Sequence, residues 1–149
     1  MNRQEIEELF AVTLTGEYED DSPWEAVRTL RQIGSREVFD LAAEWCRSEN
    51  PLVRSRGADV LSQLGQTVEH PTNSFPEESF LAVSQLLLNE SDLRPLDSAI
   101  AALGHINNPL AIPLIAKHCT HYSPKIRFSA ACALGSFALL GDPRVVEGC

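Results

Sequence analysis

The sequence lacks the local patterns that commonly mark a catalytic or metal site. It contains no CxxC pair, no glycine-rich phosphate loop, and no serine, histidine and acid in a recognisable nucleophile motif. Its eight glycines are spread singly along the chain, and most of them end predicted helices. We therefore predict no catalytic residue, no bound metal and no cofactor.

Aromatic residues and long apolar runs are also scarce. Aromatics make up 7% of the chain, although hydrophobic residues make up 44%, so Leu, Ala, Val and Ile are expected to build the core. No run approaches the roughly 18 apolar residues that a membrane span needs, and the first residues show no signal-type stretch. Cys46, Cys119 and Cys132 fall in apolar helical patterns, which suits reduced thiols. A cytoplasmic protein without membrane contact is predicted.

Positive charge is in short supply. The chain has 12 Lys and Arg residues against 21 Asp and Glu residues, which gives a formal net charge of −9. Nucleic-acid binding depends on cations that neutralise phosphates, so no nucleic-acid partner is expected. The acidity favours a basic protein or peptide as the partner.

What the sequence does contain is a repeated helical pattern. Its clearest copy is the segment 126–135, which has an apolar stripe at helical spacing, small residues in the middle and a glycine at the end. Aligned on Pro23, Arg54, Leu96 and Arg127, the copies are 31, 42 and 31 residues apart, and the longer spacing fits an insertion over 66–76. Seven positions after each of these comes a leucine. The four leucines are Leu30, Leu61, Leu103 and Leu134.

This regularity predicts an all-α protein, an α-solenoid of about four helix pairs that stack because one pair cannot bury its apolar face alone. We expect a single domain over 1–149, with an N-terminal helix over 3–15. The repeats are expected at about 22–48, 49–89, 90–120 and 121–149.

The last repeat looks incomplete, because only a short helix is predicted over 144–149. Two explanations stay open: a fragment of a longer array, or a C-terminal seam covered by a partner or by self-association. The residues of that seam are Leu134, Phe137, Leu139 and Val145.

The chain resembles the HEAT-repeat family, specifically the short HEAT-like repeats of the phycobilisome-lyase type. The residues that carry the resemblance are those of 126–135, the turn 140–143 and the segment 102–113. The resemblance covers about 22–149 and implies the fold more than the function, since such repeats serve scaffolds, lyases and hydroxylases. Repeat-built iron hydroxylases use His-Glu pairs, which are absent here, Glu69-His70 being the reverse order.

Candidate binding residues come from two sources. The second helices of the repeats are expected to form a concave surface, and exposed aromatics one position after the alignment reference are typical of interfaces. For the aromatics, packing against a neighbouring helix is the equal alternative. The predicted partner-binding residues are Glu37, Asp40, Glu44, Gln85, Lys117, Trp24 and Phe128.

Other polar residues are interpreted as structural. Arg54 and Arg127 recur at the reference position and are expected to bridge neighbouring units. His118, Cys119 and His121 have metal-ligand side chains, but we expect core residues and a loop histidine, because zinc needs more ligands than this spacing offers.

The predicted function is a non-catalytic protein-interaction or scaffold module that binds a protein or peptide, and so not an enzyme. The alternative is an enzyme or enzyme accessory subunit of the phycobilin-lyase-like kind. A third interpretation is a protein that neutralises a toxin.

Overall fold

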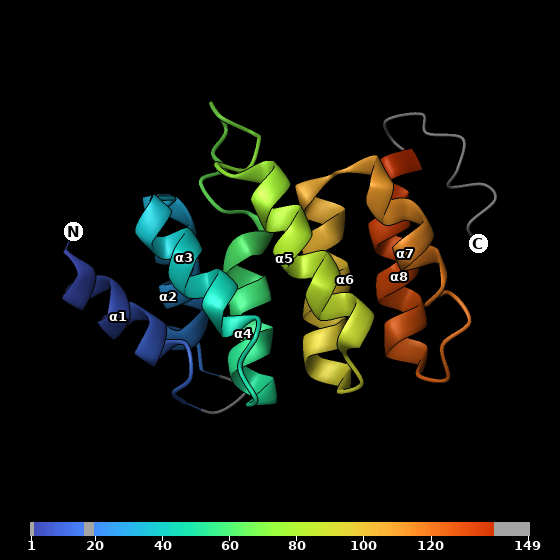
Figure 1. Cartoon of the computed structure of the whole chain (residues 1–149), viewed down its shortest axis with the longest axis horizontal. Helices are drawn as coiled ribbons and strands as arrows, with labels where there is room; N and C mark the ends of the chain where they lie inside the picture. The colour runs from blue at the N-terminus through green and yellow to red at the C-terminus, as the bar shows by residue number, and fades with distance from the viewer. Residues whose placement is uncertain (1, 17–19, 139–149) are drawn as a thin grey trace.

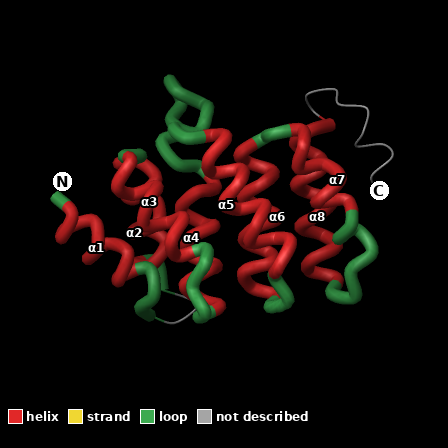
Figure 2. Tube along the Cα trace, in the orientation of Figure 1, coloured by secondary structure: helices red, strands yellow, loops and turns green. Residues whose placement is uncertain are grey.

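The protein is an α-solenoid, as predicted. The computed structural model describes residues 2–16 and 20–138, and every regular element in these ranges is a helix (Figures 1 and 2). The elements are α1 (Arg3–Val12), α2 (Ser22–Ile33), α3 (Arg36–Trp45), α4 (Pro51–Ser62), α5 (Pro76–Asn89), α6 (Leu93–Ile106), the 3-10 helix η1 (Pro109–Ala111), α7 (Ile112–Ala116) and α8 (Pro124–Ala138).

The helices form two layers. In the first-helix layer α2, α4, α6 and α8 follow one another, with α4 packed on α6 and α6 on α8. In the second-helix layer α3, α5 and α7 lie nearer the viewer in Figure 1, and each packs on the helix that follows or precedes it in the first layer. The division into four repeats stays a prediction, because the helix expected over 144–149 lies outside the described residues.

The repeated leucines fill the space between the layers. Leu30, Leu61 and Leu103 are fully buried, and Leu134 is 2% exposed. Burying each such side chain stabilises the fold by roughly 1.5–3 kcal/mol relative to exposure. The repeated leucine position in the sequence therefore identified residues of the core correctly.

The N-terminal helix is shorter than predicted. Helix α1 ends at Val12 rather than at residue 15, because the N–H of Thr13 bonds to both Leu9 and Phe10 and the chain then tightens into a turn. Gly16 follows with φ of +79°, a left-handed conformation that glycine adopts without strain.

Glycine also lets neighbouring helices approach closely. A Cβ atom at Gly57 in α4 would lie 2.7 Å from the carbonyl oxygen of Ala42 and 2.9 Å from the nitrogen of Cys46. One at Gly104 in α6 would lie 3.0 Å from the Cβ of Ala133 in α8. These two positions hold α4 against α3 and α6 against α8.

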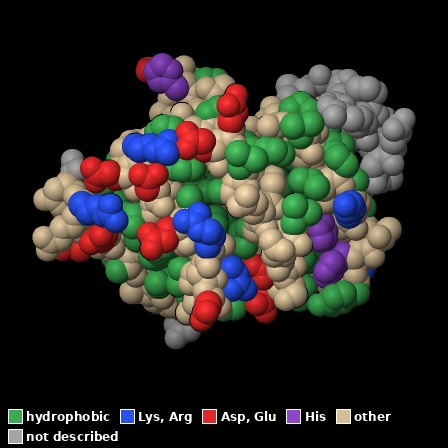
Figure 3. All heavy atoms as spheres, viewed as in Figure 1, with side chains coloured by type: hydrophobic (Ala, Val, Ile, Leu, Met, Phe, Trp, Pro, Cys, Tyr) green, Lys and Arg blue, Asp and Glu red, His purple; other side chains and the backbone are tan. Residues whose placement is uncertain are grey.

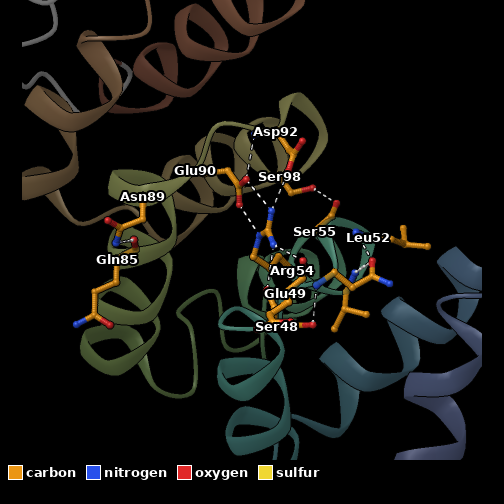
Figure 4. Close-up of polar contacts among 12 residues, drawn as sticks. Ser48, Glu49, Leu52, Arg54, Ser55, Gln85, Asn89, Glu90, Asp92 and Ser98 are labelled. Carbon is orange, nitrogen blue, oxygen red and sulfur yellow. Dashed lines mark hydrogen bonds and ion pairs between the residues drawn. The ribbon is translucent and has the colours of Figure 1, made fainter.

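Arg54 joins two successive helix pairs (Figure 4). Its Nε and Nη2 donate to the carboxylate of Glu90 at 2.7 and 2.9 Å, and Nη2 also donates to Asp92 at 3.0 Å. Its Nη1 donates to the carbonyl oxygens of Ser48 and Glu49. The side chain therefore caps the turn before α4 and clamps it to the turn before α6.

Arg127 repeats part of this arrangement at the start of α8. Its Nη1 donates to the carbonyl oxygens of His121 and Tyr122, six and five residues earlier, the same offsets as Ser48 and Glu49 from Arg54. The recurrence of arginine at the reference position thus has a local cause, the turn carbonyls that it satisfies.

Gly57→Ala should destabilise the fold by about 1–3 kcal/mol, because the added methyl group forces α4 away from α3. Alanine would otherwise favour a helix over glycine by about 1 kcal/mol. The measurement is urea unfolding followed by circular dichroism.

Gly135→Ala is the matched control for Gly57→Ala. Gly135 also lies within a helix, and nothing lies within 4 Å of the added Cβ, so this variant should keep or gain stability. Equal effects at the two positions would contradict a close-approach role for Gly57.

Arg54→Met should lower the free energy of unfolding by about 1–3 kcal/mol, because Glu90, whose side chain is 3% exposed, loses its charged donor. Changing Glu90 to Met as well should recover part of the loss in a double-mutant cycle. Arg127→Met is the control and should cost less, since Arg127 is exposed. Wild-type stability of Arg54→Met would refute the clamp.

Candidate functional site

A cleft of about 730 Å³ opens on the first-helix layer. Its walls come from the turn after α1, from the start of α2 and from the outward sides of α4, α6 and α8. The polar, charged and aromatic side chains among its lining residues are Thr13, Thr15, Asp20, Trp24, Ser55, Arg56, Asp59, Arg94, Asp97, Ser98 and Lys125.

Arg56 organises the floor of this cleft. It is 5% exposed, and its Nε donates to the carbonyl oxygen of Thr13 at 2.8 Å. Its Nη1 lies 3.3 Å from Oδ2 of Asp59. Its Cζ lies 4.7 Å from the centroid of the Trp24 ring, a cation–π contact. One side chain of α4 therefore fixes both the turn after α1 and the tryptophan of α2.

Trp24 keeps a free face in this arrangement. Its side chain is 41% exposed although one side of the ring carries the Arg56 guanidinium. We expected Trp24 either to be exposed at an interface or to pack against a neighbouring helix. The ring does both, because the contact with Arg56 holds it in place while its other face stays exposed to the cleft.

Asp59 is a buried carboxyl group among arginines. Burial raises its pKa, while a hydrogen bond with Ser98 and the charges of Arg56 and Arg31 act in the opposite direction. The Arg31 guanidinium donates from Nε and Nη2 to the backbone carbonyl oxygen of Asp59, at 2.9 and 2.6 Å. The carboxyl group is therefore a protonatable group in the wall of the cleft.

Two exposed cations lie at the rim of the cleft. Lys125 approaches Asp97 at 3.8 Å, and Asp97 also accepts a hydrogen bond from Ser129. Arg94 is exposed and has no ion pair among residues 2–16 and 20–138. The Arg94 guanidinium can therefore pair with a carboxylate on a ligand, and the exposed Lys125 can do so in exchange for Asp97.

Charge is divided between the layers. The four helices of the first-helix layer carry seven Lys and Arg residues and three Asp and Glu residues. The helices α3, α5 and α7 together carry one Lys or Arg residue and five Asp and Glu residues. The exposed charged residues of the first-helix layer are Arg28, Arg94, Lys125, Arg127 and Glu25. An acidic chain thus presents one locally basic side, which composition alone does not reveal.

The structure places the predicted partner-binding residues on both layers. Glu37, Asp40 and Glu44 are exposed on α3, Gln85 is exposed on α5, and Lys117 follows α7 directly. Trp24 and Phe128 lie instead on α2 and α8, and Phe128 is 71% exposed. The seven residues therefore belong to two separate surfaces.

The histidine and cysteine residues form no metal site within the described ranges, where no cluster of three or more potential ligands occurs. His118 is half-buried, with its ring centroid 5.9 Å from that of His121. Cys46 and Cys132 are free thiols, and burial raises the pKa of Cys46 to about 12. Cys119 is disulfide-bonded, so the expectation of a reduced thiol is wrong for this residue.

No helix among the described residues has the length and apolar character needed to cross a membrane.

Two curated proteins share sequence with most of this chain. The uncharacterized phycocyanin operon protein Z of Pseudanabaena tenuis is 30% identical over 122 residues, which are 82% of this chain and 57% of that protein. Phycocyanobilin lyase subunit alpha of Thermosynechococcus vestitus is 34% identical over 118 residues, 78% of this chain and 42% of that protein. The chain spans about half the length of these relatives. No family model matches it.

The fold has a solved neighbour. The X-ray structure of the Escherichia coli protein YibA superposes with a TM-score of 0.70 over 98% of this chain and 58% of that one. The two sequences are 20% identical, so this match supports the helical architecture alone.

The prediction that the chain is not an enzyme is wrong. It is overturned by the similarity to a protein named as a lyase subunit. The relatives favour the lyase-like alternative over a pure scaffold, and they support the resemblance to repeats of the phycobilisome-lyase type. The residues that line the cleft come from four helices and a turn, so they form no local sequence motif.

The raised pKa of Asp59 gives the protein a specific pH dependence. Since the folded pKa lies above the ordinary value of 3.8, the stability from this group is present at low pH and is lost as the pH rises through the folded pKa. The free energy of unfolding of wild type minus that of Asp59→Asn should therefore fall as the pH rises above about 3.8.

Glu78→Gln is the control, and its difference in unfolding free energy should change with pH in the opposite direction, because the hydrogen bond from Arg36 lowers the pKa of Glu78. Its stabilising contribution is present above the ordinary value of 4.5 and is lost as the pH falls. Denaturant titrations across the pH range measure both differences. If the stability difference between wild type and Asp59→Asn instead rises with pH, the ion pair with Arg56 outweighs burial in setting the pKa of Asp59.

Proposed function

We propose that this chain is a subunit of a lyase that acts on a phycocyanobilin-type pigment and works together with a protein partner. The observation that carries the proposal is the 34% identity to subunit alpha of phycocyanobilin lyase over 118 residues. The similarity to a phycocyanin operon protein points to the same class of substrate. Phycocyanin is accordingly the proposed acceptor of the pigment.

The cleft on the first-helix layer is the proposed pigment site. A bilin is an extended conjugated pigment of linked pyrrole rings that carries propionate groups. The free face of Trp24 offers a flat apolar surface on which such rings stack. Arg94 and Lys125, exposed at the rim, supply charge-assisted hydrogen bonds to the propionates.

The polar floor of the cleft suits the pyrrole nitrogens. Asp59 and Asp97 are hydrogen-bond acceptors in the wall, and Ser55 and Ser98 share a hydrogen bond of 2.7 Å there. Asp59 also holds a proton more readily than an ordinary aspartate because it is buried. In the proposed role this carboxyl group exchanges a proton with the bound pigment, while Arg56 keeps it in position.

The activity is proposed to need a second subunit. The relative is named as one subunit of a lyase, and this chain matches 42% of it. We expect the chain alone to bind the pigment and expect attachment to phycocyanin only when a partner subunit is added. Binding and activity are therefore measured separately.

The double variant Arg94→Ala/Lys125→Ala should weaken phycocyanobilin binding at least tenfold, since a hydrogen bond to a charged group contributes about 1.5–3 kcal/mol. Binding is followed by the absorbance of the pigment and by quenching of tryptophan fluorescence. Trp24 and Trp45 are the two tryptophans, so Trp24→Phe should remove most of the quenching.

Lys117→Ala is the matched control, because Lys117 is an exposed cation beside α7, outside the cleft. It should bind the pigment like wild type. The proposal fails if the wild-type chain binds no phycocyanobilin and also adds nothing to pigment attachment when combined with a lyase partner subunit and apo-phycocyanin.

A further inference from the structure

The outward side of the second-helix layer carries exposed leucines. Leu81 and Leu88 on α5 are 58% and 63% exposed, and Leu110 on η1 is 63% exposed. Leu81 and Leu88 are seven residues apart and so share one side of the helix. In Figure 3, which shows this side of the molecule, hydrophobic side chains gather over α5 and α7. Such grouped apolar surface commonly marks an interaction site.

An acidic edge lies on the neighbouring helix α3. Glu37, Asp40 and Glu44 recur at helical spacing on α3, and all three are exposed. Arg36 pairs with Asp40 at 3.2 Å and with Glu78 at 2.8 Å, whereas Glu37 and Glu44 have no ion pair among the described residues. In Figure 3 acidic and basic side chains are interspersed over α1 and α3, and further charged side chains lie over the lower ends of α4 to α6 and near α7.

A groove of about 630 Å³ separates the two areas. Ala43 of α3 and Ala82 and Leu86 of α5 give it apolar walls, and the amide side chains of Gln85 and Asn89 lie along it. Its charged lining residues are the exposed Arg47 and the ion pair of Arg54 with Glu90. Side chains from a partner have room to enter here, and the amides offer both donors and acceptors.

We propose that this side of the second-helix layer docks an amphipathic, basic helix of a partner protein. Its apolar side chains cover Leu81, Leu88 and Leu110, and its Lys or Arg side chains face Glu37 and Glu44. A helix fits because apolar surface, groove and acidic edge follow one another across the layer, the pattern that an amphipathic helix complements. The cations of the partner find opposite charge here and like charge on the first-helix layer.

This proposal refines the predicted binding residues and does not rest on the pigment site. Glu37, Glu44 and Gln85 stay in the docking surface, while Trp24 and Phe128 are excluded from it because they lie on the other layer. The exposed leucines are added, a feature that becomes visible once exposure is known residue by residue.

The probe is a synthetic amphipathic helix built from Leu and Lys, labelled for fluorescence anisotropy. The double variant Leu81→Ser/Leu88→Ser should weaken its binding at least about tenfold through lost apolar contact. Glu37→Gln/Glu44→Gln should weaken binding about three- to tenfold at low salt and flatten its salt dependence. All substituted side chains are exposed, so the fold is expected to survive, and circular dichroism checks it.

Phe128→Ser is the control, since Phe128 is a large exposed apolar residue on the opposite layer; it should leave binding of the probe unchanged. A matched Leu/Glu helix should not bind. The proposal is overturned if the leucine variant binds like wild type or if the acidic helix binds equally well. It is also overturned if sedimentation shows a dimer of this chain that the leucine variant abolishes.

Phycocyanobilin titrations of the same variants separate this proposal from the pigment site. The leucine variant should bind the pigment like wild type while losing the helix, which attributes the loss to the docking surface. If the leucine variant loses binding of both the Leu/Lys helix and phycocyanobilin, the two surfaces are not independent and the proposal is contradicted.

Discussion

The fold depends on how closely the helices of neighbouring units can approach. A side-chain atom at Gly57 would clash with the backbone of the preceding helix, and one at Gly104 would press tightly on Ala133 of α8. With the helices this close, the leucines at the repeated position, from Leu30 to Leu134, are all buried. Each pair is therefore stabilised by its neighbours, as is general for repeat proteins.

The same stacking gives the molecule two chemically different sides. The first helices pack on one another and leave a cleft that both carboxylates and cations line, with Arg94 and Lys125 exposed there. The second helices present exposed leucines, together with the carboxylates of Glu37 and Glu44, which have no ion pair among the described residues. Arg56 is central to the first side, because it joins the turn after α1 to α4 and also holds Trp24. The proposed pigment cleft and the proposed docking surface lie on opposite layers, so both could be occupied at once.

The sequence predicted the parts of the structure that repeat and missed those that occur once. The leucine register could be found because a leucine recurs in every copy. The two arginines were expected to bridge neighbouring units, which holds for Arg54, whereas the bonds of Arg127 go to the turn before its own helix. The Arg56 contacts could not, since Thr13 and Arg56 are 43 residues apart in an unrepeated pairing. The expectation of a non-enzyme is contradicted by the similarity to a lyase subunit, a relationship that no local motif in the sequence indicates. Trp24 was noticed, but its contact with Arg56 could not be foreseen.

The central claim is that a bilin occupies the first-helix layer. The most direct test is amide hydrogen exchange of the chain with and without phycocyanobilin. With the pigment bound, exchange is expected to slow in the turn after α1, in α2 and at the start of α6, and to stay unchanged in α3 and α5. Slower exchange confined to α3 and α5, or no change anywhere at saturating pigment, would contradict it.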